Sequence, residues 1–324
     1  GYKRQVQYFI AESIGRILES GGQSDLRALL CEQVSVSRIR PTRLIRRSKQ
    51  TGRLKAFRRP QHPKKENTMW INTHDKNRLY AQSFGDEQAP ALIFCNSLGT
   101  DHTMWQPQID ALAADYRMIA YDTRGHGRSS AEGSGWTLAD LGKDVISVLD
   151  GFGIESAQFC GISMGGLTGL WLAIHRAERF SRLTVSNTAA KIGNAAAWQV
   201  RAEIVRSEGM GSIADSAASR WFTPAFCERR PNTVARLTDT LRHSHAEGYA
   251  QCCAVLATAD VRALVHQADV AVQVIGAKHD AVTTVADAQW LAQNLPRASL
   301  AVLPGAHIAN IEATAEFNRL LRPA

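Results

Sequence analysis

The sequence predicts an α/β fold with a mainly parallel central sheet, helices on both faces and a helical lid inserted late in the chain. Three observations support this prediction. Short apolar runs that suit buried strands alternate with amphipathic helical patterns. One of these runs leads directly into Gly-Ile-Ser-Met-Gly at residues 161–165, and a helical pattern follows. From about residue 189 to residue 258, helical patterns follow one another without a clear strand.

The predicted strands recur along the chain between residues 70 and 303. Residues 70–73 and 79–84 have the pattern of a hairpin at the edge of the sheet. A continuous apolar run is typical of a strand buried on both faces, and such runs occupy residues 91–95 and 118–121. Further strand patterns follow at residues 183–186, 270–275 and 299–303.

Helices are expected between these strands. At residues 137–152, Thr137 and Asp140 resemble a capping box, and the apolar residues fall on one helix face. Further helical patterns follow at residues 213–220, at residues 234–241 and from residue 311 onward. A helical segment inserted between successive strands is expected to cover the active site, so the stretch from about 189 to 258 is the predicted lid.

Ser163 lies in a Gly-x-Ser-x-Gly segment between a predicted strand and a predicted helix, which is the pattern of a nucleophile elbow. This turn holds its serine in a strained conformation, so the neighbouring residues must be small. Gly161 and Gly165 supply that room, and Gly166 lets the following helix pack close to the strand. A chance match is the alternative, and the flanking strand and helix argue against it. Ser163 is the predicted nucleophile.

Asp280 and His307 are the predicted acid and base. A serine hydroxyl needs a base to take its proton, and that base needs a carboxylate to orient it. Each residue follows a predicted strand, and the chain order is serine, acid, histidine. Alone, Asp280 suits a turn aspartate and His307 a surface histidine, whereas with Ser163 they predict a triad at one sheet edge. Three other histidines do not complete this order: His102, His126 and His279.

An oxyanion hole needs two backbone N–H groups aimed at the developing negative charge. Met164, directly after the nucleophile, is one predicted donor, and Leu98 in the loop 96–100 is the other. The glycines around Ser163 do not fit G-x-G-x-x-G, and the sequence contains no phosphate loop or metal-ligand spacing. We therefore expect neither a cofactor nor a metal.

The length of 324 residues suits one domain of about 200–250 residues with additional sequence. The net charge of +8 is unevenly distributed. Residues 1–68 carry 16 Lys and Arg against 5 Asp and Glu, whereas the remainder carries 22 against 25. The basic character thus belongs to the N-terminal stretch, and nucleic-acid binding is not expected of the main domain at residues 69–324.

Residues 1–68 allow several interpretations. Their Arg-rich, acid-poor composition suits a nucleic-acid arm, a targeting peptide or a small regulatory module. The alternative is that translation begins at Met69, the first methionine of the chain, just before the first predicted strand. We favour this alternative and expect residues 1–68 to lie outside the fold. A test is expression from Met69.

No run of about 18 apolar residues occurs, so no membrane-spanning segment is expected. The cysteines show no CxxC spacing, and two of them are adjacent. Such cysteines suit reduced, mostly buried thiols in a cytoplasmic protein better than a disulfide framework. The six are Cys31, Cys95, Cys160, Cys227, Cys252 and Cys253.

These residues together resemble the α/β-hydrolase superfamily across residues 69–324. The usual His-Gly of the oxyanion loop is replaced by Asn96-Ser97 in NSLGTDHTMW. In this departure the chain resembles one branch, the 3-oxoadipate enol-lactonases of aromatic (protocatechuate and catechol) catabolism. Further similar stretches are DTRGHGRS at 122–129, GISMGG at 161–166, RWFTPAF at 220–226 and GYAQCCAVLATADVR at 248–262. The last two lie in the predicted lid, where substrates are selected.

The resemblance implies hydrolysis of 3-oxoadipate enol-lactone, a small molecule, through an acyl-enzyme. Because this substrate carries a free carboxylate, a cation is expected in the lid or near the oxyanion loop. Arg220 and Arg124 are the candidates, although a structural role suits each of them as well. Trp105 and Trp136 are candidates to wall the pocket, with core packing as the alternative.

Other functions remain open at this stage. A carboxylesterase, a perhydrolase-type esterase or a C–C bond hydrolase of the same fold would share the elbow and the triad. A non-catalytic ligand-binding protein of this fold usually lacks a triad member, whereas all three are present here. The sequence does not define the oligomeric state.

Overall fold

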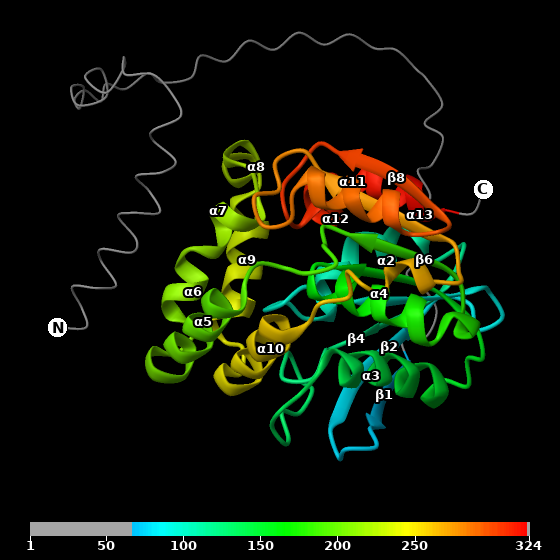
Figure 1. Ribbon diagram of the computed structural model, residues 1–324, viewed down its shortest axis with the longest axis horizontal. Helices are drawn as coiled ribbons and strands as arrows, with labels where there is room; N and C mark the ends of the chain where they lie inside the picture. Colours follow the sequence, from blue (N-terminus) through cyan, green and yellow to red (C-terminus); the bar gives the residue numbers. More distant parts are fainter. Residues whose placement is uncertain (1–66, 323–324) are drawn as a thin grey trace, which may run out of the picture. The chain divides into compact units, whose positions relative to one another are not determined.

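The computed structural model describes residues 67–322. Its centre is an eight-stranded sheet in the order β1-β2-β4-β3-β5-β6-β7-β8 (Figure 1). The pairs β1–β2 and β2–β4 are antiparallel, and all the other neighbours are parallel. The strands are β1 (Asn67–Asn72), β2 (Arg78–Phe84), β3 (Ala91–Cys95), β4 (Arg117–Tyr121), β5 (Ala157–Ile162), β6 (Phe180–Ser186), β7 (Val272–Ala277) and β8 (Ala298–Leu303). The mainly parallel sheet predicted from the sequence is therefore confirmed.

Several strand boundaries differ from the sequence prediction by one to three residues, and β7 lies at 272–277 instead of 270–275. β1 begins at Asn67 rather than at residue 70, because Asn67 and Thr68 already pair with β2. The expected boundary of the fold after residue 68 is thus at least two residues late. β6 also begins earlier, at Phe180, because its first residues pair with β5. The other predicted features of residues 1–66 lie outside the described residues.

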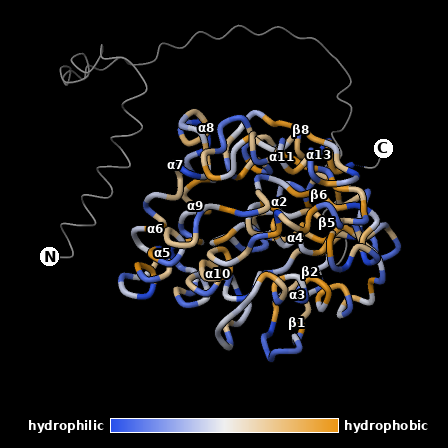
Figure 2. The backbone as a smooth tube through the Cα atoms, viewed as in Figure 1, coloured by the Kyte–Doolittle hydropathy of each residue, from blue (hydrophilic) through white to orange (hydrophobic). Residues whose placement is uncertain are grey.

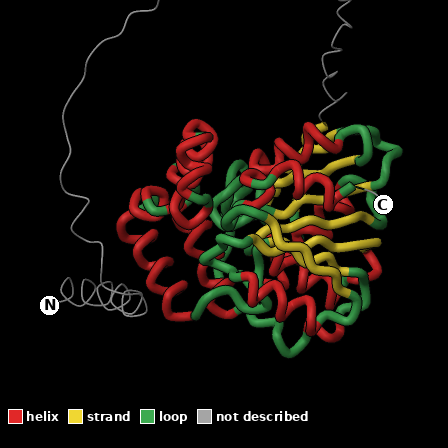
Figure 3. Tube along the Cα trace, turned by 90° about the horizontal axis from the view of Figure 1, so that it is seen from above, coloured by secondary structure: helices red, strands yellow, loops and turns green. Residues whose placement is uncertain are grey.

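Helices lie on both sides of the sheet (Figure 3). They are α2 (Gln106–Leu112), α3 (Leu138–Gly151), α4 (Met164–His175), α11 (Val285–Asn294), α12 (Ala309–Glu312) and α13 (Thr314–Leu321). The predicted capping box is present, because the Thr137 side chain accepts from the Asp140 N–H while the Asp140 carboxylate accepts from the Thr137 N–H. α3 buries the apolar face expected from its pattern.

Between β6 and β7 the described chain contains six α-helices and no strand, as the sequence predicted. They are α5 (Ala195–Glu208), α6 (Gly211–Asp215), α7 (Ala217–Trp221), α8 (Pro224–Arg229), α9 (Pro231–Arg242) and α10 (Ala246–Thr258). We call these helices the cap. Figures 1 and 3 show the cap as a separate group at one end of the strands.

Hydrophobic residues concentrate along the strands and the helices packed on them (Figure 2). The cysteines of the described part are free thiols: Cys95, Cys160, Cys227, Cys252 and Cys253. The adjacent Cys252 and Cys253 are both buried, and burial raises their pKa values. Cys31 lies outside the described residues. Among the helices of residues 67–322, none has the length and apolar character needed to cross a membrane.

Candidate active site

Ser163 occupies the sharp turn between β5 and α4, with φ of 56° and ψ of −117°. Such a positive φ is unfavourable for a residue other than glycine, and it persists only where the surroundings enforce it. The turn is closely packed: a Cβ at Gly161 would overlap the Gly165 carbonyl, and a Cβ at Gly165 would overlap the Cys95 carbonyl. The Ser163 N–H donates to the Ser186 carbonyl at 3.0 Å. These contacts fix the serine at the carboxyl end of the sheet.

His307 and Asp280 meet at the same end of the sheet. His307 Nδ1 lies 2.9 Å from Asp280 Oδ2, and both side chains are buried. Asn187 Nδ2 donates to Asp280 Oδ2 at 2.9 Å, and the Thr283 N–H donates to Oδ1 at 3.0 Å. Burial alone would raise the pKa of Asp280, but the His307 partner and these hydrogen bonds lower it to about 2. Asp280 is therefore ionised at neutral pH and orients the imidazole.

Ser163 and His307 line the same cavity, so the structure brings all three predicted triad residues together. Among the hydrogen bonds of residues 67–322, none joins Ser163 to His307 directly. Catalytic hydrogen bonds of sites without substrate are often long and tighten in the complex. The arrangement suits a serine nucleophile with an oriented base.

The two predicted oxyanion donors, Leu98 and Met164, lie on adjoining loops. Leu98 follows β3 and lines the cavity, and Met164 begins α4 directly after the nucleophile. The Gly165 N–H donates to the Asn96 carbonyl at 3.1 Å, which ties the two loops together. Neither the Leu98 N–H nor the Met164 N–H has a protein acceptor in the described part of the chain. Both donors are thus free to bind a developing oxyanion.

Trp105 does not wall the cavity, so this expectation is wrong. Its ring is fully buried and stacks on Phe94, with 4.5 Å between the ring centroids. Its Nε1–H donates to Asn96 Oδ1 at 2.8 Å, while Asn96 Nδ2 donates to the Tyr121 carbonyl at 2.8 Å. Asn96, which replaces the usual histidine of this loop, is therefore a framework residue that Trp105 holds in place.

Arg124 and Trp136 also lie away from the cavity lining, which corrects their expected role in substrate binding. The Arg124 guanidinium is fully buried between two carboxylates, 2.6 Å from Asp144 and 2.7 Å from Asp75. It also lies 5.3 Å from the centroid of the Trp136 ring. Because these carboxylates already occupy the guanidinium, it is unavailable to a substrate. Its role is structural.

The cavity has a volume of about 260 Å³ and lies between the sheet and the cap. This volume suits a small substrate. Ser97, Leu98, Ser163, Val282 and His307 line it from the sheet side. The cap and the segment that leads into it contribute Ile192, Gly193, Asn194, Ala197, Trp198, Arg201, Arg220, Trp221, Leu241 and Tyr249. The aromatic wall is thus formed by Trp198, Trp221 and Tyr249 rather than by the tryptophans expected from the sequence.

Two arginines of the cap face this cavity. Arg220, predicted from the sequence, donates to the Ile213 carbonyl at 3.0 Å and to the Ser216 hydroxyl. Arg201, which sequence reasoning missed, lies 4.9 Å from the centroid of the Trp198 ring. Neither forms an ion pair with a carboxylate of residues 67–322. Burial and the charge of Arg201 lower the pKa of Arg220, as expected for two neighbouring cations that lack an anion.

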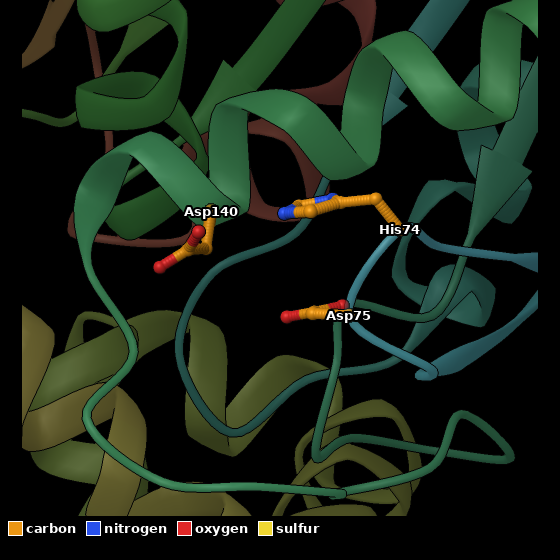
Figure 4. A group of neighbouring side chains, drawn as sticks. All are labelled: His74, Asp75 and Asp140. Carbon is orange, nitrogen blue, oxygen red and sulfur yellow. The ribbon is translucent and has the colours of Figure 1, made fainter.

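Outside this site, His74, Asp75 and Asp140 come together from the β1–β2 turn and the start of α3 (Figure 4). Their possible ligand atoms lie within 4.8 Å of one another. The carboxylates already have partners, because Asp75 binds Arg124 and Asp140 accepts from the Thr137 cap. The neighbouring guanidinium would repel a cation. We therefore assign no metal to this group.

Comparison with known proteins shows the family to which the chain belongs. A family model described as "alpha/beta hydrolase fold" matches residues 90–314, so the chain belongs to the α/β-hydrolase family. The chain is 50% identical over 252 residues to 3-oxoadipate enol-lactonase 2 of Acinetobacter baylyi, covering 76% of this chain and 94% of that protein. It is 42% identical over 250 residues to 3-oxoadipate enol-lactonase 1 of the same organism, covering 77% and 94%.

A solved structure supports the same assignment. The enol-lactonase from Burkholderia xenovorans LB400 superposes with a TM-score of 0.76 at 39% sequence identity, covering 78% of this chain and 98% of that one. Within the α/β hydrolases, the chain therefore belongs to the 3-oxoadipate enol-lactonase family.

Proposed function

We propose that this protein hydrolyses 3-oxoadipate enol-lactone to 3-oxoadipate by a Ser163–His307–Asp280 triad, as a step in aromatic catabolism. One observation carries the proposal: a single cavity joins a serine and an oriented histidine to two arginines that have no carboxylate partner among the described residues. A nucleophile with an oriented base suits ester cleavage, and unpaired cations suit a substrate that carries a carboxylate. Membership of the enol-lactonase family supports this substrate.

In the first half of the reaction, His307 takes the proton of the Ser163 hydroxyl as its oxygen attacks the lactone carbonyl carbon. The negative oxygen of the tetrahedral intermediate lies between the N–H groups of Leu98 and Met164. The ring C–O bond then breaks, which leaves an acyl-enzyme and releases the ring oxygen as an enolate. An enolate is a better leaving group than an alkoxide, so protonation by His307 matters less in this step. The enolate oxygen then takes up the proton held by His307, which returns the imidazole to its neutral form, and the enol tautomerises to the ketone.

In the second half, His307 takes a proton from water, whose oxygen attacks the acyl carbon. Ser163 Oγ leaves and regains its proton from His307, and the product is released as a dicarboxylate. The ionised Asp280 stabilises the imidazolium that forms in both halves. No cofactor takes part in this scheme.

Arg201 and Arg220 are the proposed binding site for the substrate carboxylate. Both side chains are half-buried, and their reduced contact with water strengthens the attraction to an anion. A hydrogen bond between a guanidinium and a carboxylate is also roughly twice as strong as a neutral one. Trp198, Trp221 and Tyr249 would contact the apolar faces of the lactone ring. The cap would thus select the substrate and serve as the lid. The free, largely buried thiols are compatible with a reducing compartment, and we place the activity in the cytoplasm.

The test is the loss of ultraviolet absorbance of the enol-lactone on addition of the purified full chain, beside p-nitrophenyl acetate. We expect kcat/KM of about 10⁴–10⁸ M⁻¹s⁻¹ for the lactone and only slow hydrolysis of the acetate. Rapid acetate turnover with an untouched lactone would instead identify a carboxylesterase of the same fold. No turnover of either would favour a ligand-binding protein.

A further inference from the structure

His126 lies in the loop after β4, and neither of its ring nitrogens reaches the cavity lining. The ring is 1% exposed, and both of its nitrogens have backbone partners. Nε2 lies 2.9 Å from the Gly99 nitrogen, which donates its hydrogen, and Nδ1 lies 3.1 Å from the Arg124 carbonyl oxygen. Because an N–H group only donates, Nε2 must be the acceptor, and Nδ1 then carries the hydrogen. The structure thus defines one neutral tautomer.

Gly99 belongs to the turn that presents the proposed oxyanion donor. The Thr100 N–H donates to the Ser97 carbonyl at 3.2 Å, and the Thr100 hydroxyl donates to the same oxygen at 2.8 Å. Leu98 and Gly99 are the central residues of this turn, and the φ of Gly99 is 81°, as at the third position of a type II turn. The Leu98–Gly99 peptide can rotate between two turn types unless its N–H has a fixed partner. His126 provides that partner.

The cap packs against both the His126 loop and the oxyanion turn. Gly125 and Gly248 of α10 touch so closely that a Cβ on either would overlap the backbone of the other. The rings of His126 and Tyr249 lie 6.4 Å apart, and a Cβ at Gly99 would overlap Leu241 of α9. The stretches DTRGHGRS and GYAQCC, which lie far apart in the sequence, therefore meet beside the oxyanion turn.

We propose that His126 is a positioning residue: its unprotonated Nε2 holds the Gly99 N–H and so fixes the Leu98–Gly99 peptide, which adjoins the Ser97–Leu98 peptide that carries the proposed oxyanion donor. This role rests on the proposed hydrolysis at Ser163, although it applies to any ester. Burial lowers the pKa of His126 and favours the neutral ring, against the opposing effects of the Arg124 carbonyl, Asp122 and Asp101. His126 is therefore excluded as a competing catalytic base, since both of its nitrogens are engaged.

The kinetic test compares His126→Phe, which keeps a ring without an acceptor, with His126→Gln, which supplies an acceptor oxygen near the position of Nε2. Complete loss of an oxyanion donor lowers kcat about 10²- to 10³-fold, so a misdirected donor in the Phe variant should lower it about 10- to 100-fold. KM should change little, and the Gln variant should recover most of kcat. The exposed His243→Phe in the cap is the matched control, and it should equal the wild type.

An oxyanion analogue separates positioning from general damage. A boronic acid adds to the serine oxygen and places a negative oxygen in the oxyanion hole, so its inhibition constant should rise with the loss of kcat in the Phe variant. The assay uses p-nitrophenyl acetate as well as the lactone. If the wild-type enzyme hydrolyses the acetate but not the lactone, the proposed substrate is wrong. The role of His126 can then still be tested with the acetate.

A second measurement needs no variant. In ¹⁵N NMR of the wild-type enzyme at neutral pH, the His126 ring should show the neutral Nδ1–H tautomer. An Nε2–H tautomer or a protonated ring would overturn the proposal, because neither accepts from Gly99. The proposal also fails if the Phe variant keeps its kcat and boronate affinity, or if the Gln variant is as impaired as the Phe variant.

Discussion

The sheet side of the cavity and the cap side are built on different principles. On the sheet side, Ser163, Asp280 and His307 follow strand ends and are held by hydrogen bonds from neighbouring loops. On the cap side, Arg201 and Arg220 project from helices, and neither has a carboxylate partner among residues 67–322. The catalytic side chains of the sheet side are thus hydrogen-bonded before substrate binds, whereas the arginines of the cap side are available to bind an anionic ligand. We infer that the sheet supplies the chemistry and the cap supplies the selection.

The largest expected effect comes from the nucleophile. Ser163→Ala should lower kcat for the lactone by a factor on the order of 10⁶, because the triad acts as a unit. Substrate should still bind, since the arginines of the cap are unchanged. Single-turnover kinetics and equilibrium binding measure the two quantities separately. Ser207→Ala, an exposed serine on α5, is the matched control. Loss of binding along with turnover would contradict the division between the two sides.

Asp280→Asn should lower kcat by about 10⁴, because an amide at this position favours the wrong tautomer of His307. KM should remain near the wild-type value. A steady-state comparison on the lactone and on p-nitrophenyl acetate should give the same loss for both esters, since the defect lies on the sheet side. A loss confined to the lactone would mean that Asp280 acts in substrate selection.

The arginines of the cap should affect the two esters differently. Arg201→Met and Arg220→Met each remove a charged hydrogen-bond donor worth about 1.5–3 kcal/mol, so kcat/KM for the lactone should fall about 10- to 100-fold. Turnover of the uncharged p-nitrophenyl acetate should stay near the wild-type rate. Arg206→Met is the control, because Arg206 forms only an exposed ion pair with Glu247, worth about 1 kcal/mol or less. An equal loss on both esters would mean that the arginines support the cap rather than the substrate.

The smallest expected effect is on the free energy of unfolding. Its pH dependence tests whether the contacts of Asp280 on the sheet side stabilise the folded protein. The pKa of Asp280 is lowered to about 2, whereas an unfolded aspartate titrates near 3.9. Its stabilising contribution is therefore present above about pH 4 and is lost as the pH falls toward 2. Urea unfolding of the wild type and Asp280→Asn between pH 5 and pH 2.5 should show a difference that shrinks by about 1–2 kcal/mol. A constant difference would mean that this carboxylate is not specifically stabilised.

The sequence predicts the sheet side well, because its residues have local causes. An elbow needs small residues next to Ser163, and strand ends bring Asp280 and His307 to one edge, so spacing and order suffice. The cap side has no such pattern. Arg124 and Arg220 look alike in the sequence, yet one is enclosed by Asp144 and Asp75 and the other faces the cavity.

Packing between distant segments accounts for these differences. Arg124 pairs with Asp75 of the β1–β2 turn and with Asp144 of α3, so its environment depends on how this turn packs against the helix. No local sequence pattern encodes that packing. Arg201 was missed for the same reason, since only the packing of α5 against α10 turns it toward the cavity. Its spacing of three residues from Trp198 is the one local signal, and that signal is common on helices.

The cap leaves the sheet after β6 and returns to β7, and these strands are direct neighbours in parallel register. The connection at residues 187–271 therefore enters and leaves the sheet between two directly paired strands, so its helices can differ in length without altering which strands pair. It still contacts the catalytic side through Asn187, which donates to Asp280, and through Gly248, which packs against Gly125. A cap exchanged between related sheets would therefore have to keep these contacts for the acid and the oxyanion turn to retain their places.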